Sequence, residues 1–101
     1  MTDMADTAAP PGQAQSIAAA EIRMEIRRYI LEDILLGSGE ALDDVASLSA
    51  TGIIDSLGAL ELVAFLEAEF NIRIGDKDLV PANLDSVNGI VALVERKLAA
   101  Q

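Results

Sequence analysis

The sequence contains no cysteine and no histidine. Without cysteine the chain has no disulfide and no thiolate chemistry of its own. Without histidine it lacks the commonest general base and metal ligand, and a Ser–His nucleophilic pair is excluded. Aromatic residues are scarce as well, since Tyr29, Phe65 and Phe70 are the only three. The core must therefore be aliphatic, which here favours close-packed helices over a sheet.

Basic residues are also few, with seven Lys and Arg against seventeen Asp and Glu and a net charge of −10. A nucleic-acid-binding protein needs a basic face to displace counterions from phosphates, so the composition argues against that class. Anionic membrane surfaces are disfavoured for the same reason, and no stretch is long and apolar enough to predict a membrane span. The charge favours partners with basic patches, although it also serves simply to keep a small protein soluble.

With 101 residues the chain has room for one domain with one modest core. Residues 1–15 are rich in Ala, Thr, Pro, Gly and Gln and predict a disordered N-terminal leader, followed by a domain over residues 16–101. The leader has neither a basic start nor an apolar run, so it does not resemble a secretory signal. We therefore expect a cytoplasmic protein.

Helical periodicity and capping residues predict an all-α fold, a four-helix bundle with three main helices and one short helix. The expected main helices are Ser16–Leu36, Asp55–Asn71 and a last one that begins at Asp85. Pro81 limits any helix in residues 72–85 to about one turn. A long first loop, residues 37–55, joins the first two helices, and such a loop is usually functional or internally packed. Four apolar side chains are expected to pin it to the core: Val45, Leu48, Ile53 and Ile54.

The second helix has an unusual outer face. At 100° per residue, one side gathers the residues expected in the core, Leu62, Val63, Leu66 and Phe70. The opposite side gathers a second apolar strip with acids beside it, Leu57, Leu60, Ala64, Glu61 and Glu67. Between Glu32 and Glu69 there are nine acids and no base. Scattered surface apolar residues are normal, but this pattern favours a docking face for basic partners with an apolar centre and a charged rim.

Ser56 lies at the predicted start of this helix, where backbone N–H groups are unpaired and the helix dipole favours an anion. That location suits a covalently attached phosphate diester. An ordinary N-cap is the competing interpretation. Asp85-Ser86-Val87 repeats the pattern at the next helix start without an exposed acidic apolar strip, so we interpret Ser86 as a plain cap. The Asp-Ser pair alone therefore does not decide the role of Ser56.

The sequence combines Gly52-Ile53-Ile54-Asp55-Ser56-Leu57 with Leu60-Glu61-Leu62-Val63, Leu66-Glu67-Ala68-Glu69-Phe70 and Ile74-Gly75-Asp76. Over roughly residues 20–100, these segments and the helix order resemble the acyl carrier protein family. The resemblance implies a carrier without catalysis of its own. A phosphopantetheinyl transferase, using coenzyme A and Mg²⁺, would attach a 4'-phosphopantetheine arm to Ser56, and the arm's thiol would hold an acyl group as a thioester.

The resemblance also implies roles for the residues around Ser56. Asp55 would help to form the transferase site, and partner enzymes would contact Leu57, Leu60, Glu61, Ala64 and Glu67. Gly58 and Ala68 stand where housekeeping fatty-acid carriers usually have acids, which leaves fatty-acid, polyketide and specialised acyl or aminoacyl pathways open. Asp55 argues against a peptidyl carrier, whose family usually has glycine before the serine.

Two other classes remain as alternatives. A helical adaptor without an arm could bind a basic partner through the second helix. An enzyme would need a metal or a shaped cleft, and the sequence signals neither, because Asp76 and Asp78 lack the spaced oxygens and closing glutamate of a calcium loop. We expect a monomeric protein that is neither an enzyme nor a metal-binding protein.

Overall fold

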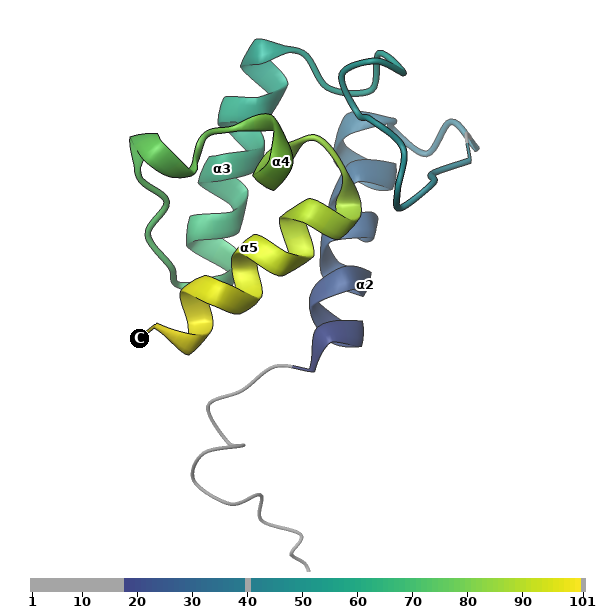
Figure 1. Ribbon diagram of the computed structural model, residues 1–101. Coiled ribbons are helices and arrows are strands. Elements are labelled where there is room, and N and C mark those ends of the chain that lie inside the picture. The colour runs from purple at the N-terminus through teal and green to yellow at the C-terminus, as the bar shows by residue number, and fades with distance from the viewer. Residues whose placement is uncertain (1–17, 40, 101) are drawn as a thin grey trace, which may run out of the picture.

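The computed structural model describes residues 18–39 and 41–100. The predicted leader over residues 1–15 therefore lies outside the described residues. Within them the fold is all-helical without strands, which confirms the predicted class. The helical elements, in chain order, are α2 (Ala19–Tyr29), η1 (Ile30–Ile34), α3 (Ser56–Phe70), η2 (Asp76–Asp78), α4 (Pro81–Leu84) and α5 (Val87–Ala99). In Figure 1 α2 and α3 run antiparallel, and α5 packs against both of them.

The first helix is shorter than predicted. Ala18 has an extended backbone, so the helix begins at Ala19 and not at the predicted cap Ser16, which lies outside the described residues. At the other end α2 runs into η1, a π-helical turn, in which the Leu35 N–H donates to the Ile30 carbonyl at 2.8 Å. The Gly37 N–H then donates to the Leu31 carbonyl at 2.8 Å, so the helix ends at Ile34.

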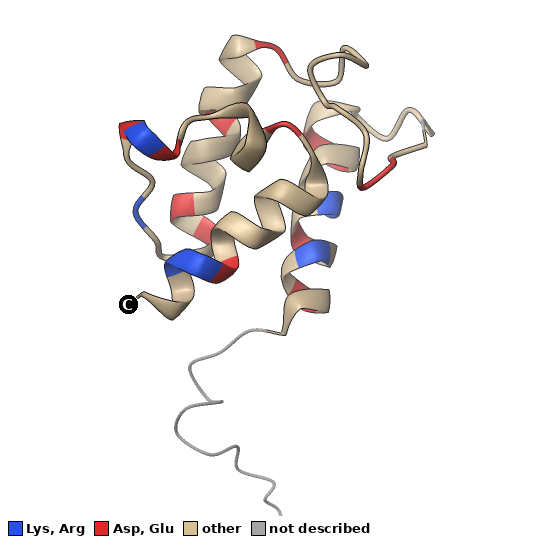
Figure 2. Ribbon diagram, in the orientation of Figure 1, with Lys and Arg blue, Asp and Glu red and all other residues tan. Residues whose placement is uncertain are grey.

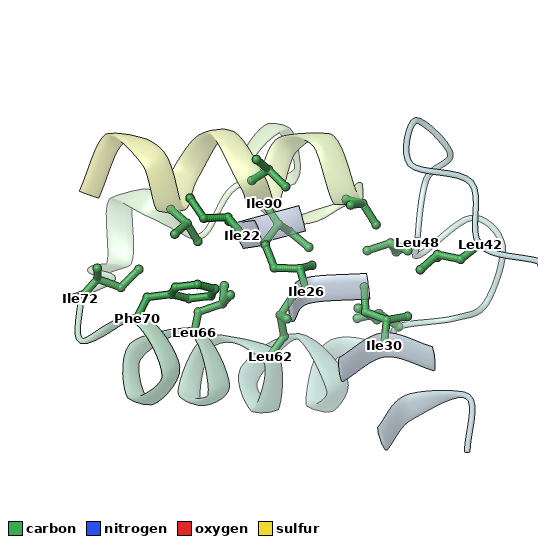
Figure 3. Packing of buried hydrophobic residues seen from close by; sticks show 14 residues of the cluster. Ile22, Ile26, Ile30, Leu42, Leu48, Leu62, Leu66, Phe70, Ile72 and Ile90 are labelled. Atoms are coloured by element: carbon green, nitrogen blue, oxygen red, sulfur yellow. The ribbon is translucent and has the colours of Figure 1, made fainter. Parts of the chain in front are cut away.

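The core is aliphatic, as the scarcity of aromatic residues indicates. It is formed by one apolar face from each long helix, and Figure 3 shows the α3 side chains Leu62, Leu66 and Phe70 pointing toward Ile22 and Ile26 of α2. The α5 residues of this core are Val87, Ile90, Val91 and Val94. Burying such side chains contributes about 1.5–3 kcal/mol each. Of the four α3 residues predicted for the core, Leu62, Leu66 and Phe70 are buried. The prediction for Val63 is wrong, because Val63 is only half-buried and lines a groove on the side of α3 that faces residues 79–84.

The first loop is pinned to this core, although not by all of the predicted residues. Leu48 and Ile54 are buried and Ile53 packs against them, but Val45 is 71% exposed, so that prediction is wrong. Leu42 is buried instead. The reason is a polar contact that local sequence does not reveal: the Asp44 carboxylate accepts hydrogen bonds from two arginines of α2 and so fixes which neighbouring side chains face inward.

The segment between α3 and α5 is fixed by polar contacts to the C-terminal part of α5. The Asp78 carboxylate pairs with Lys97 at 2.6 Å and accepts the Gly75 N–H at 3.0 Å, and these contacts lower the pKa of Asp78. Arg96 donates to the Asn83 side chain at 2.9 Å. Pro81 is the first residue of the single-turn helix α4, as expected.

Candidate functional site

The start of α3 separates the roles of Asp55 and Ser56. Asp55 is the N-cap: its Oδ1 accepts the Gly58 N–H at 2.7 Å. Ser56 is the first helical residue and is exposed. Within residues 18–39 and 41–100, no group is hydrogen-bonded to the Ser56 hydroxyl. The hydroxyl is therefore free to react, because its aspartate neighbour performs the capping.

The second Asp-Ser pair has the opposite arrangement. Ser86 is the N-cap of α5, and its Oγ accepts the Gly89 N–H at 3.0 Å, which confirms the interpretation of Ser86 as a cap. The Asp85 carboxylate accepts hydrogen bonds from the Ser47 hydroxyl and from the Ser49 N–H, and both lower its pKa. At both helix starts the capping residue lies three positions before a glycine, Asp55 before Gly58 and Ser86 before Gly89. The position of the glycine is therefore a sequence signal that distinguishes the two serines.

The surroundings of Ser56 suit a phosphate ester. The first turn of α3 has no acidic side chain beyond its cap, and its unpaired N–H groups present the positive end of the helix dipole. A negatively charged diester on the Ser56 oxygen would meet these donors at the surface. The described residues around Ser56 therefore fit a 4'-phosphopantetheine arm.

A groove of about 710 Å³ lies next to Ser56, between the first half of α3 and the segment that contains α4. Its α3 wall includes Ala59, Leu60 and Val63. Its other wall includes Leu79, Val80 and Leu84. The sequence does not reveal this groove, because residues 79–84 show no helical period and Val63 falls at helical spacing with the core residues of α3. The groove is predominantly apolar and can shelter an acyl group from water.

The outer face of α3 has the predicted composition near Ser56. Leu57 and Leu60 are 65% and 60% exposed, and Ala64 and Glu61 are also exposed. Figure 2 shows acidic and no basic residues on α3. The structure brings these four residues together with Ser56 on one helix, and Leu60 contributes to the groove as well.

Glu67 differs from the other predicted docking residues. It is half-buried, and its Oε2 accepts the Ile74 N–H at 2.8 Å, so its carboxylate holds the chain that leaves α3. On the α2 side of α3, Phe65 stacks on Tyr29 with ring centroids 4.1 Å apart. Partial burial, and then the charges of Glu61 and Asp33, raise the pKa of Tyr29.

Other kinds of site receive no support in the part of the chain that the structure describes. No three Asp or Glu side chains there are grouped so that they could hold a metal ion. None of the described helices is long and apolar enough to cross a membrane.

Comparisons with known proteins agree with this geometry. The family model described as "Phosphopantetheine attachment site" matches residues 26–94. The chain is 33% identical over 75 residues to the probable acyl carrier protein PigG of Serratia sp. (strain ATCC 39006), covering 74% of this chain and 86% of that one. It is 34% identical over 74 residues to an acyl carrier protein homolog of Mycoplasmopsis pulmonis (strain UAB CTIP), covering 73% and 97%.

The class is thus a helical carrier with a covalent 4'-phosphopantetheine arm. The chain belongs to the acyl carrier protein family.

Proposed function

We propose that this protein carries acyl intermediates as thioesters on a 4'-phosphopantetheine arm attached to Ser56. The observation that supports this residue is the free, exposed Ser56 hydroxyl beside the groove, in contrast to Ser86, whose hydroxyl caps α5. In the attachment step the Ser56 oxygen forms a bond to the pantetheine phosphorus of coenzyme A. The pyrophosphate P–O bond breaks, adenosine 3',5'-bisphosphate leaves, and the hydroxyl proton is released. The arm supplies the thiol that a chain without cysteine lacks.

The residues of this chain would position the arm and its cargo. Asp55 holds the first turn of α3 through Gly58 and so fixes the direction of Ser56. The groove would shelter an apolar cargo while the protein moves between enzymes. We propose a fatty-acid, polyketide or specialised acyl or aminoacyl pathway, with a dedicated carrier at least as well supported as a housekeeping one, because Gly58 and Ala68 replace the usual acids.

The proposed partners are a phosphopantetheinyl transferase and acyl-loading and acyl-processing enzymes with basic docking patches. They would contact the face made of Leu57, Leu60, Glu61, Ala64 and Glu67. Basic patches are favoured because nine acids and no base lie between Glu32 and Glu69. We further propose that the protein is a cytoplasmic monomer and has no catalytic activity of its own.

The test is the mass of the protein after incubation with a broad-specificity transferase and coenzyme A. Wild type should gain one phosphopantetheine, and Ser56→Ala should gain none. The matched control is Ser86→Asn, which removes the second hydroxyl but keeps a side chain that caps well, and it should be modified like wild type. Modification of Ser56→Ala would show that another residue carries the arm. An unmodified wild type would favour the alternative of a helical adaptor.

A further inference from the structure

The groove beside Ser56 has two chemically different parts. At the start of α3 its lining includes the polar residues Ser49, Asp55 and Asp85. These lie together, because the Ser49 N–H donates to the Asp85 carboxylate at 2.8 Å, and the Leu48 backbone joins Asp85 to Ile54 just before α3. The polar part is therefore next to Ser56.

The other part, farther along α3, is apolar. Its walls are the α3 side chains and the facing side chains of residues 79–84 already described. Leu60 is 60% exposed, and Leu79 and Val80 are 39% and 41% exposed. These large side chains would be covered by an apolar group that enters the groove, which is the main source of affinity in such a site.

The apolar part ends beyond Val63. Four and seven residues farther on, the same side of α3 carries Glu67 and Phe70. The Glu67 carboxylate accepts the Ile74 N–H at 2.8 Å, and Phe70 is buried in the core. Neither residue lines the groove. The chain that leaves α3, held by Glu67, therefore closes this end.

The closed end limits the length of a cargo. Val63 lies seven residues after Ser56, which corresponds to about 10 Å along an α-helix. An extended chain of single bonds advances about 1.2 Å per bond, as the extended backbone does. The groove therefore accommodates about eight carbons in a straight line, and the end of a longer chain would remain in water.

The charges of the lining limit the kind of cargo. None of the described residues that line the groove is Lys or Arg, whereas Asp55 and Asp85 are acidic. A cargo with its own carboxylate would lose water there without a cationic partner, which is unfavourable. The net charge of −10 likewise disfavours a second copy of this chain as the occupant. A cargo tethered at Ser56, which itself lines the groove, has a high effective concentration there.

We propose that this groove selects the cargo of the carrier, and that it takes uncharged, apolar acyl groups of up to about eight carbons. Val63 is the specificity-determining residue, because it forms the last part of the α3 wall before the closed end. The proposal rests on the attachment of the arm at Ser56. It separates short and medium apolar acyl groups from long-chain and dicarboxylic ones.

The experiment loads the protein with a broad-specificity transferase and acyl-coenzyme A thioesters, namely butyryl, hexanoyl, octanoyl, decanoyl and dodecanoyl. Intact mass confirms loading, and circular dichroism gives the melting temperature. A group that binds only the folded state raises this temperature. It should rise at each step from butyryl to octanoyl and then stay constant. Adipoyl has the length of hexanoyl but ends in a carboxylate, and it should give no rise above the protein with an unacylated arm.

A pair of matched variants tests Val63. Val63→Phe adds volume inside the groove, so the rise should end at hexanoyl or at a shorter group. The control Val45→Phe makes the same change at a residue of the first loop that is 71% exposed, and its rise should end at octanoyl, as in wild type. Each variant is compared with its own form that carries the unacylated arm, so that a general change in stability cancels.

The outcomes separate this inference from the proposed function. A wild type that gains no arm contradicts both. If the arm is attached but no acyl group raises the melting temperature, or if the rise continues to dodecanoyl, the cargo selection alone is overturned. Equal rises for adipoyl and hexanoyl overturn the selection against charge, and a rise that ends at octanoyl in Val63→Phe overturns the role of Val63. If the melting temperature of the unacylated protein increases with protein concentration, a second copy occupies the groove and the proposal is wrong.

Discussion

Asp55 caps α3 and lies next to Ser56, the proposed attachment site, and two substitutions separate its structural role from its proposed role in the modification. Asp55→Ala removes the acceptor of the Gly58 N–H, a hydrogen bond of 2.7 Å. Loss of an N-cap costs about 1 kcal/mol, which lowers the melting temperature of a domain of this size by about 4–8 °C. Asp55→Asn keeps an oxygen that can accept the same hydrogen bond. It loses only the interaction of the charge with the helix dipole, about 0.5 kcal/mol.

The modification rate should respond differently from stability. The resemblance to acyl carrier proteins implies that the Asp55 carboxylate helps to form the transferase site, and Oδ1 is used by the cap. A hydrogen bond to a charged group is worth about 1.5 kcal/mol, or about tenfold in rate. Asp55→Asn should therefore lose about tenfold in kcat/KM while its melting temperature changes little.

The assay is transferase kinetics by intact mass, with thermal unfolding followed by circular dichroism. Gly58→Ala is a control that leaves the carboxylate in place, although its added methyl would lie 3.2 Å from Asp55 Oδ1. If Asp55→Asn melts as low as Asp55→Ala, the oxygen of the cap is not what stabilises α3. If Asp55→Asn is modified as fast as wild type, the charge has no part in recognition and Asp55 acts only through the helix.

Two further predictions concern acidic residues. Glu61→Lys should slow the modification of Ser56 at low salt without loss of stability, because Glu61 is exposed. Glu67→Lys should also lower the melting temperature, because the Glu67 carboxylate accepts the Ile74 N–H; equal melting temperatures of the two variants would contradict this. Lys97 and the Gly75 N–H lower the folded-state pKa of Asp78, and hydrogen bonds from Ser47 and Ser49 lower that of Asp85. The stabilisation by these two carboxylates is therefore complete above about pH 4, and it is lost as the pH falls through their folded-state pKa values. Asp85→Asn should make the free energy of unfolding, measured by urea denaturation at a series of pH values, fall less steeply below about pH 4.

The sequence alone determined the helical class and most of the core. Isoleucine and leucine recur at helical spacing in α2, α3 and α5, and local periodicity requires no knowledge of the fold. It also located Ser56 at a helix start, because residues that cap helices act within one turn. The family motifs around Ser56 led to the same residue.

Only the tertiary structure decided the points that depend on distant contacts. Val45 faces solvent because Asp44 binds arginines of α2, about twenty residues earlier in the chain, and no local pattern reports such a pair. The groove beside Ser56 exists because Leu79 and Val80, from an irregular segment, come to lie opposite α3. The Asp-Ser dipeptide is the same at both helix starts, and the position of the cap decides that Ser56 is free and that Ser86 is not. The glycine three residues after each cap is the one local signal of that difference.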